Sequence, residues 1–182
     1  MDRERATSQP SWSKLFGRTA FGRSESASTA GVNTPEKRFS KTQPAEHFYA
    51  NAIRFEEMFR LLIFPLRDQR SLQIEMDFAE ETATEYRRHL YEFADIDSIV
   101  LDGIFLLKRG FQRYYDVSVW LDCGFATALE RAVARAQEGL SPEETVRAYR
   151  DIYFPAQQIH FQRDAPRSAA TLVLNNDPRA QG

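Results

Sequence analysis

Three short apolar runs constrain the fold of this 182-residue chain more than any other feature. They cover residues 99–101, 117–121 and 172–174, and amphipathic stretches typical of helices lie between them. Each run ends in polar or turn-forming residues, namely Asp102-Gly103, Asp122-Cys123-Gly124 and Asn175-Asn176-Asp177. Short, mostly apolar strands that alternate with helices indicate a parallel sheet covered on both faces. The sequence therefore predicts an α/β fold.

The region before these runs predicts a long helix followed by a strand. The helix opens at Pro44 and stops at Phe64-Pro65, since proline cannot continue it. Its apolar stripe recurs every three or four residues, at Phe48, Ala52, Phe55, Phe59 and Leu62. Alternating apolar and polar residues over 72–78 then predict a half-buried strand. Residues 80–93 fit either a helix or the second strand of a hairpin.

Two further helices are predicted after the second apolar run. The first covers residues 125–137. The second begins at Ser141-Pro142-Glu143-Glu144, which is a capping box with proline at the first helical position. Pro155 must kink or interrupt this second helix.

Composition excludes several classes of protein. No apolar run approaches the roughly twenty residues of a membrane-spanning helix, and no apolar block follows the basic N-terminus as in a secretory signal. Cys123 is the only cysteine, which excludes an internal disulfide framework and a cysteine-built zinc site. A net charge of −2 argues against a protein built mainly to bind nucleic acid. We expect a cytoplasmic protein with no membrane partner.

The N-terminal part differs from the rest of the chain. Residues 1–31 are rich in serine, threonine and arginine and show no apolar periodicity. Such a stretch buries too little apolar surface to offset its ordering entropy, so it is predicted to be a disordered tail. A nucleic-acid-binding arm is the alternative. The globular body is predicted to span residues 32–178.

The strand ends carry the candidate chemistry, because ligands of open parallel sheets bind beyond the carboxyl ends of the strands. Asp102 follows the first apolar run directly and can hold Mg²⁺, either directly or through water. A turn-forming Asp-Gly pair is the alternative explanation. Arg131 and Arg135 lie four residues apart and can clamp a polyphosphate from one helix face. A solvated helix face beside Glu130 and Glu138 is their alternative explanation.

Three segments of the sequence also resemble a known family. They are residues 98–135, 149–177 and 33–67, which include the stretches "SIVLDGIFLLKRG", "YRDIYFPAQ" and "PEKRFSKTQPAEHFYANAIRFEEMF". Their order and spacing resemble the bacterial branch of the uridine kinase-like P-loop nucleoside kinases. The resemblance spans roughly residues 33–177.

The resemblance implies transfer of the γ-phosphate of ATP, with Mg²⁺, to the 5′-hydroxyl of uridine or cytidine. It assigns Asp102 to the acidic position that ends the Walker-B-like strand, as the catalytic and metal-binding residue. It assigns Arg131 and Arg135 to the lid arginines that face the nucleotide phosphates. Its substrate-binding positions correspond to Phe48, Tyr49, Arg54, Tyr153, Gln157 and His160. Core packing of the aromatic residues and an exposed helix face for the others are the alternatives.

The chain departs from this family at its phosphate-binding loop. The family has G-x-x-x-x-G-K-[ST] between a first strand and a helix, and no such motif occurs here. Gly17–Ser24 comes nearest, with Arg23 in the place of the lysine, but too few residues follow it for the helix and second strand of a βαβ unit. No aspartate occurs between Asp2 and Asp68, so the family's base on the acceptor hydroxyl is also missing. The predicted fold is thus an incomplete P-loop NTPase, with a nucleoside kinase-like parallel sheet flanked by helices.

Three functional hypotheses follow from this departure. The chain is a truncated, inactive piece of a uridine kinase-like enzyme, a pseudokinase-type module for nucleotide binding or protein interaction, or an active kinase with an unusual loop. The family's P-loop strand lies near the centre of its sheet. Loss of this strand exposes strand edges and an apolar face, which predicts self-association.

Overall fold

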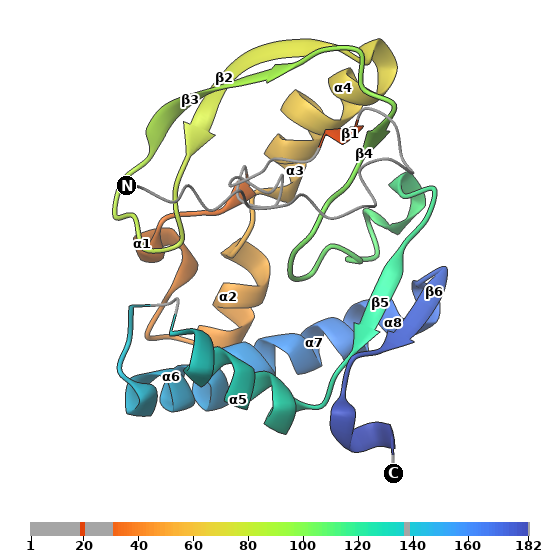
Figure 1. The fold of residues 1–182 in the computed structure, drawn as a ribbon. Helices are drawn as coiled ribbons and strands as arrows, with labels where there is room; N and C mark the ends of the chain where they lie inside the picture. Colours follow the sequence, from red (N-terminus) through yellow and green to blue (C-terminus); the bar gives the residue numbers. More distant parts are fainter. Residues whose placement is uncertain (1–18, 21–30, 137–138, 182) are drawn as a thin grey trace, which may run out of the picture.

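A β-hairpin and a broken helical run enclose much of the buried part of the molecule (Figure 1). The computed structural model describes residues 19–20, 31–136 and 139–181. The hairpin consists of β2 (Leu72–Phe78) and β3 (Arg87–Phe93), paired antiparallel over their full length. The alternating pattern over 72–78 is therefore confirmed as a strand, and residues 87–93 form the second strand of a hairpin and not a helix.

The helical run that begins at Pro44 is interrupted where a neighbouring segment pairs with it. It consists of α2 (Pro44–Asn51), α3 (Phe55–Met58), the π-helical η3 (Phe59–Ile63) and α4 (Phe64–Gln69). Between α2 and α3, the Arg54 amide donates to the Gly31 carbonyl over 2.7 Å. Gly31 allows this approach, because a Cβ there would lie 2.9 Å from the Ile53 side chain.

The predicted stop of this run at Phe64-Pro65 is wrong. The π turn of η3 precedes Pro65, and the Phe64 amide donates to the Phe59 carbonyl five residues earlier. This wider turn lets the chain pass a proline that has no N–H to give. A second π turn, η5 (Tyr149–Tyr153), lies in the same position before Pro155, between α6 (Pro142–Ala148) and α7 (Phe154–Asp164).

The parallel strands form two separate pairs. β5 (Val119–Asp122) and β6 (Leu172–Asn175) pair in parallel, as the sequence predicts for the second and third apolar runs. β4 (Ser98–Ile99) pairs in parallel with β1 (Thr19–Ala20) and not with β5. Within the described residues, the three expected strands therefore do not share one sheet, because β4 is only two residues long and bonds to β1.

The predictions for residues 1–31 fall mostly outside the described part of the chain. The disordered tail and the loop candidate Gly17–Ser24 both lie there, apart from Thr19–Ala20, which form β1, and Gly31. Where the body begins, α1 (Pro35–Arg38) lies next to the turn between β2 and β3 (Figure 1). The remaining elements are η4 (Gln112–Tyr114), α5 (Phe125–Arg135), α8 (Pro166–Ala169) and η6 (Pro178–Gln181).

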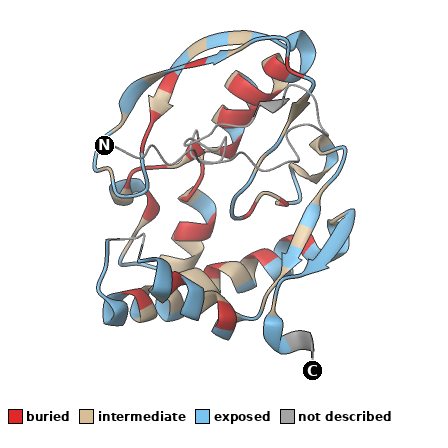
Figure 2. Cartoon of the chain, viewed as in Figure 1, coloured by how far each residue is buried: buried red, intermediate tan, exposed pale blue. Residues whose placement is uncertain are grey.

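The hydrophobic core lies between the hairpin and the helical run (Figure 2). Phe59 is central to it, with its ring 4.7 Å from that of Phe111 and 5.7 Å from that of Tyr114. Thirteen other buried residues belong to the same cluster, from Phe48 in α2 to Ala156 in α7. The stripe predicted on residues 48–62 is thus buried throughout, although its helix is broken.

The β5–β6 pair has one covered face and one open face. On the covered face, Trp120 meets Phe161 of α7 with 5.6 Å between the ring centroids. The opposite face carries four aliphatic side chains that are between 47% and 55% exposed: Val119, Leu121, Leu172 and Leu174. A patch of this kind is unusual on a monomer.

Substitution of Ser141 tests the capping box. The Ser141 hydroxyl accepts from the Glu144 amide over 3.2 Å, and the Glu144 carboxylate accepts from the Ser141 amide over 2.9 Å. Ser141→Ala should lower the free energy of unfolding by about 1 kcal/mol, measured by urea denaturation. Ser168→Ala, which removes an exposed hydroxyl in α8, is the control. Equal midpoints for the two variants would contradict the role of the cap.

The open face of the β5–β6 pair predicts self-association. Sedimentation velocity should show an average mass that rises with protein concentration. Leu121→Lys should reduce this rise, since it places a charge in the middle of the open face. Leu90→Lys makes the same change at an exposed leucine of the hairpin, and should leave the rise in average mass with concentration unaltered. A sharp melt of a monomer, independent of concentration, argues against the prediction.

Candidate functional site

Two cationic side chains, Lys37 and Arg54, lie against the ring of Tyr86, and a third, Arg38, follows Lys37 in α1 and interacts electrostatically with the same tyrosine. We call Lys37, Arg38, Arg54 and Tyr86 the basic cluster. The Arg54 guanidinium carbon lies 4.7 Å from the centroid of the Tyr86 ring, and the Lys37 ammonium lies 4.8 Å from it. Both distances are within the range of cation–π attraction. The Tyr86 hydroxyl donates to the Asn33 side chain over 2.5 Å, which fixes the ring.

Arg38 is the most buried member of the basic cluster, at 6% exposed. Its guanidinium donates to the carbonyl of Glu81 in the hairpin turn. Its Nε is buried and has no hydrogen-bond partner within the described part of the chain. Burial lowers the pKa of Arg38, while the nearby Glu81, Tyr153 and Tyr86 act in the opposite direction. Arg38 is thus a desolvated cation whose hydrogen bonding is incomplete.

Arg54 holds a different position, at the edge of the cluster. It donates to the Glu57 carboxylate and to the Asp77 carbonyl, each over 2.6 Å. These contacts join α3 to the hairpin. The guanidinium is therefore fixed in place beside Tyr86.

A second group of polar residues is buried around Asp164, at the end of α7. The Asp164 carboxylate accepts from the Tyr49 hydroxyl over 2.5 Å and from the Arg109 amide over 2.9 Å. It lies 2.6 Å from Nδ1 of His160, a residue that is 1% exposed. We call Tyr49, His160 and Asp164 the Asp164 network. It connects α2, α7 and the loop after β4.

Opposing effects set the pKa values in this network. Burial acts to raise the pKa of Asp164, but hydrogen bonds from Tyr49, Arg109 and His160 outweigh it, and the pKa lies below its ordinary value. Burial lowers the pKa of His160, against the attraction of Asp164. Burial likewise lowers the pKa of Lys108 to about 8, and its ammonium donates to the Tyr49 carbonyl over 2.6 Å.

The ends of β5 and β6 carry a third group of polar residues. Asp177 accepts from the Thr127 hydroxyl over 2.8 Å and from the Gly124 amide over 2.9 Å, so it caps the start of α5. These bonds lower the pKa of Asp177. Arg131 donates to the Asn176 carbonyl over 2.9 Å. The "NND" ending of the last strand thus anchors α5.

The residues predicted as one site lie in different places. Asp102 is exposed in the loop after β4, and Arg135 is exposed in the last turn of α5. Phe48, Tyr49 and His160 are buried in the core, where they pack against neighbouring rings and the Asp164 network. Tyr153 is half-buried at 4.9 Å from the Phe48 ring, and Gln157 is half-buried on α7. Only Arg54 joins the basic cluster.

Sequence reasoning did not identify Lys37, Arg38 or Tyr86 as site residues. Lys37 and Arg38 are adjacent in α1, but Tyr86 is about fifty positions away in the chain. It lies directly before β3, in a stretch whose periodicity fitted both a helix and a strand. Only the hairpin brings this ring to the two cations.

The described residues contain no group of three or more His, Cys, Asp or Glu side chains that could hold a metal ion. Mg²⁺, however, is commonly held by one or two carboxylates together with substrate phosphates. The exposed Asp102 carboxylate fits this kind of binding. Within the same residues, no helix has the length and apolar character to cross a membrane.

Acidification should destabilise the protein through His160. Its pKa lies below the value of about 6.5 found in unfolded chains, so the unfolded state takes up a proton first as pH falls. The free energy of unfolding should then drop as pH falls below about 6.5, by up to about 1.4 kcal/mol per pH unit for this one proton. His160→Gln, whose amide can still donate to Asp164, should flatten the slope in urea titrations. His47→Gln should keep the wild-type slope. An unchanged slope in His160→Gln would rule out this residue as the source.

Comparison with known proteins shows which fold the chain has. A search for protein families finds none that matches, and no curated protein matches the sequence. Among solved structures, the chain is similar to a possible uridine kinase from Bacillus stearothermophilus, with a TM-score of 0.58 and 16% sequence identity. The match covers 80% of this chain and 67% of that one. The chain therefore has a kinase-like α/β fold.

Proposed function

We propose that this chain is a phosphotransferase scaffold that binds ATP with Mg²⁺ and acts on a small hydroxyl compound. The observation that supports this most is the fold shared with the possible uridine kinase over 80% of the chain. The sequence resemblance, on residues 33–177, points to the same family. Uridine and cytidine are accordingly the first acceptors to test.

In this proposal Asp102 holds the Mg²⁺ ion that neutralises the β- and γ-phosphates. It lies in the loop after a parallel strand, which is the usual place for such a ligand in an α/β sheet. As an exposed carboxylate, Asp102 is accessible to a metal–nucleotide complex. Arg131 and Arg135 are the candidate phosphate contacts. Arg131 would keep its bond to the Asn176 carbonyl and use its remaining donors.

The acceptor side of the proposed site is the basic cluster. Arg54 is held beside Tyr86 by Glu57 and Asp77, and so is preorganised to contact a ligand. The buried positions of Phe48, Tyr49 and His160 favour a supporting role for these residues, in which they shape the core behind the site. Tyr153 and Gln157 are accessible enough to touch a substrate.

A nucleotide-binding or interaction module without catalysis is the second candidate function. Its support is the lack of an aspartate between Asp2 and Asp68 and of a G-x-x-x-x-G-K-[ST] motif in the sequence. A cradle of backbone amides and a base supply much of the stabilisation of a phosphoryl-transfer transition state. The open β5–β6 face gives such a module a surface for a partner.

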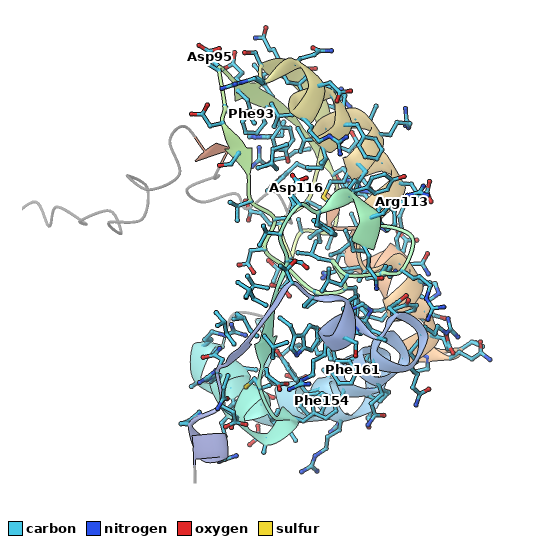
Figure 3. All side chains as sticks on the ribbon, turned by 90° about the vertical axis from the view of Figure 1, so that its right-hand side faces the viewer. Phe93, Asp95, Arg113, Asp116, Phe154 and Phe161 are labelled. Carbon is cyan, nitrogen blue, oxygen red and sulfur yellow. The ribbon has the colours of Figure 1, made fainter. Side chains whose placement is uncertain are left out.

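The two functions differ in measurable ways. Calorimetry on the full chain should detect binding of ATP that strengthens when Mg²⁺ is added. Asp102→Asn should weaken the Mg²⁺-dependent part about tenfold or more, because it removes one charged contact. Asp116→Asn, at an exposed aspartate before β5, should leave it unchanged (Figure 3).

Phosphoryl transfer from ATP to uridine or cytidine separates the alternatives. Transfer supports the kinase, whereas ATP binding with no transfer supports the module. Absence of ATP binding with and without Mg²⁺ would overturn both the kinase and the nucleotide-binding module, and would leave only the interaction module. Retention of the full Mg²⁺ effect in Asp102→Asn would remove this residue from the site.

A further inference from the structure

We propose that the basic cluster is a binding site for a small oxyanion, the carboxylate or phosphate group of a metabolite-sized ligand. The site consists of Lys37 and Arg54, which lie against the ring of Tyr86, and of Arg38, which is bonded to the nearby hairpin turn.

The first argument is the state of Arg38. A buried guanidinium is costly unless a carboxylate or another anion compensates it. Arg38 is 6% exposed, and within the described residues it has no carboxylate at ion-pair distance and no partner for Nε. Within the described residues, the guanidinium donates to the neutral Glu81 carbonyl, and its carbon lies 5.2 Å from the centroid of the Phe39 ring. These neutral groups compensate the charge only in part, and the buried Nε donor is left for an oxyanion to bind.

The second argument is the convergence of like charges. Lys37 and Arg54 both lie within 5 Å of the centroid of the Tyr86 ring, at 4.8 and 4.7 Å. The hydrogen bond from Tyr86 to Asn33 fixes this ring. Two like charges are thereby held at one ring, and an anion bound near them lowers their mutual repulsion.

The nearby carboxylates do not balance these three cations. Glu57 pairs with Arg54 over 2.6 Å, and the Asp77 carboxylate pairs with Arg88 over 3.1 Å. Glu81 acts on Arg38 only at longer range, because the bond between them uses its backbone carbonyl. The cluster therefore keeps an excess of positive charge. Guanidinium groups bind carboxylate and phosphate through paired N–H donors, so an oxyanion fits this excess.

The approach to Arg38 runs past the turn of the hairpin. Most residues of this turn, 80–85, are exposed, and the turn supplies the Glu81 carbonyl that Arg38 binds. An oxyanion would replace this carbonyl. The assignment of this site to the acceptor of the phosphoryl group rests on the proposed function. It implies an acceptor with an acidic group, which uridine and cytidine lack. The anion site itself does not depend on nucleotide binding.

Thermal unfolding of the full chain without nucleotide tests the site. Inorganic phosphate, malonate and glycerol 3-phosphate are each compared with sodium chloride at equal ionic strength, and glycerol is the uncharged control. A ligand that binds only the folded state raises the melting temperature as its concentration rises. If the site prefers a phosphate group, we expect this rise with phosphate and with glycerol 3-phosphate. If it prefers a carboxylate, we expect the rise with malonate. Glycerol should give no rise in either case.

Three variants make the test specific. Arg38→Met should abolish the anion-dependent rise, and Lys37→Gln, at an exposed side chain, should weaken anion affinity about fivefold. Lys41→Gln removes an exposed charge close by and should retain the wild-type response. If Arg38→Met fails to fold, the comparison of Lys37→Gln with Lys41→Gln still tests whether the basic cluster binds the anion.

The site is overturned if no anion stabilises the wild type beyond the salt control, or if all variants respond equally. Anion binding without any ATP binding would leave the site standing and refute only its assignment to an acceptor.

Discussion

The arrangement of α2, α7 and the loop after β4 depends on the buried carboxylate of Asp164. It ends α7 and accepts hydrogen bonds from Tyr49 in α2 and from the Arg109 amide in the loop after β4. Three segments distant in the sequence are thereby fixed to one charged group. A buried carboxylate is tolerated only when its oxygens are satisfied, so the loss of one partner leaves an expensive charge behind.

This contact also links the fold to the proposed function. The loop that Asp164 holds through Arg109 contains Asp102, the proposed metal ligand. On the other side, Tyr49 belongs to α2, which leads through Ala52 and Ile53 to Arg54 and the basic cluster. The same polar network therefore supports both sides of the proposed site. Phe48, Tyr49 and His160, predicted as substrate contacts, are buried in the core at or beside this network.

Local patterns predicted local structure well. The alternation over 72–78 specifies β2, because each side chain reports its face of the sheet. The capping box at Ser141 specifies the start of α6, because its hydrogen bonds span only three residues. Arg38 and Asp164 gave no such signal for their long-range bonds, since Glu81 and Tyr49 lie more than forty positions away from them. Proline at 65 misled the prediction because a π turn, which leaves no mark in the sequence, accommodates it.

The central claim is that a kinase-like fold presents Asp102 to a metal–nucleotide complex. A crystal structure of the full chain, grown with Mg²⁺ and a non-hydrolysable ATP analogue, tests this most directly. The account predicts Mg²⁺ at about 2.1 Å from an Asp102 oxygen, or one water molecule away, with the nucleotide phosphates on its other side. Nucleotide bound at a place remote from Asp102 would contradict it.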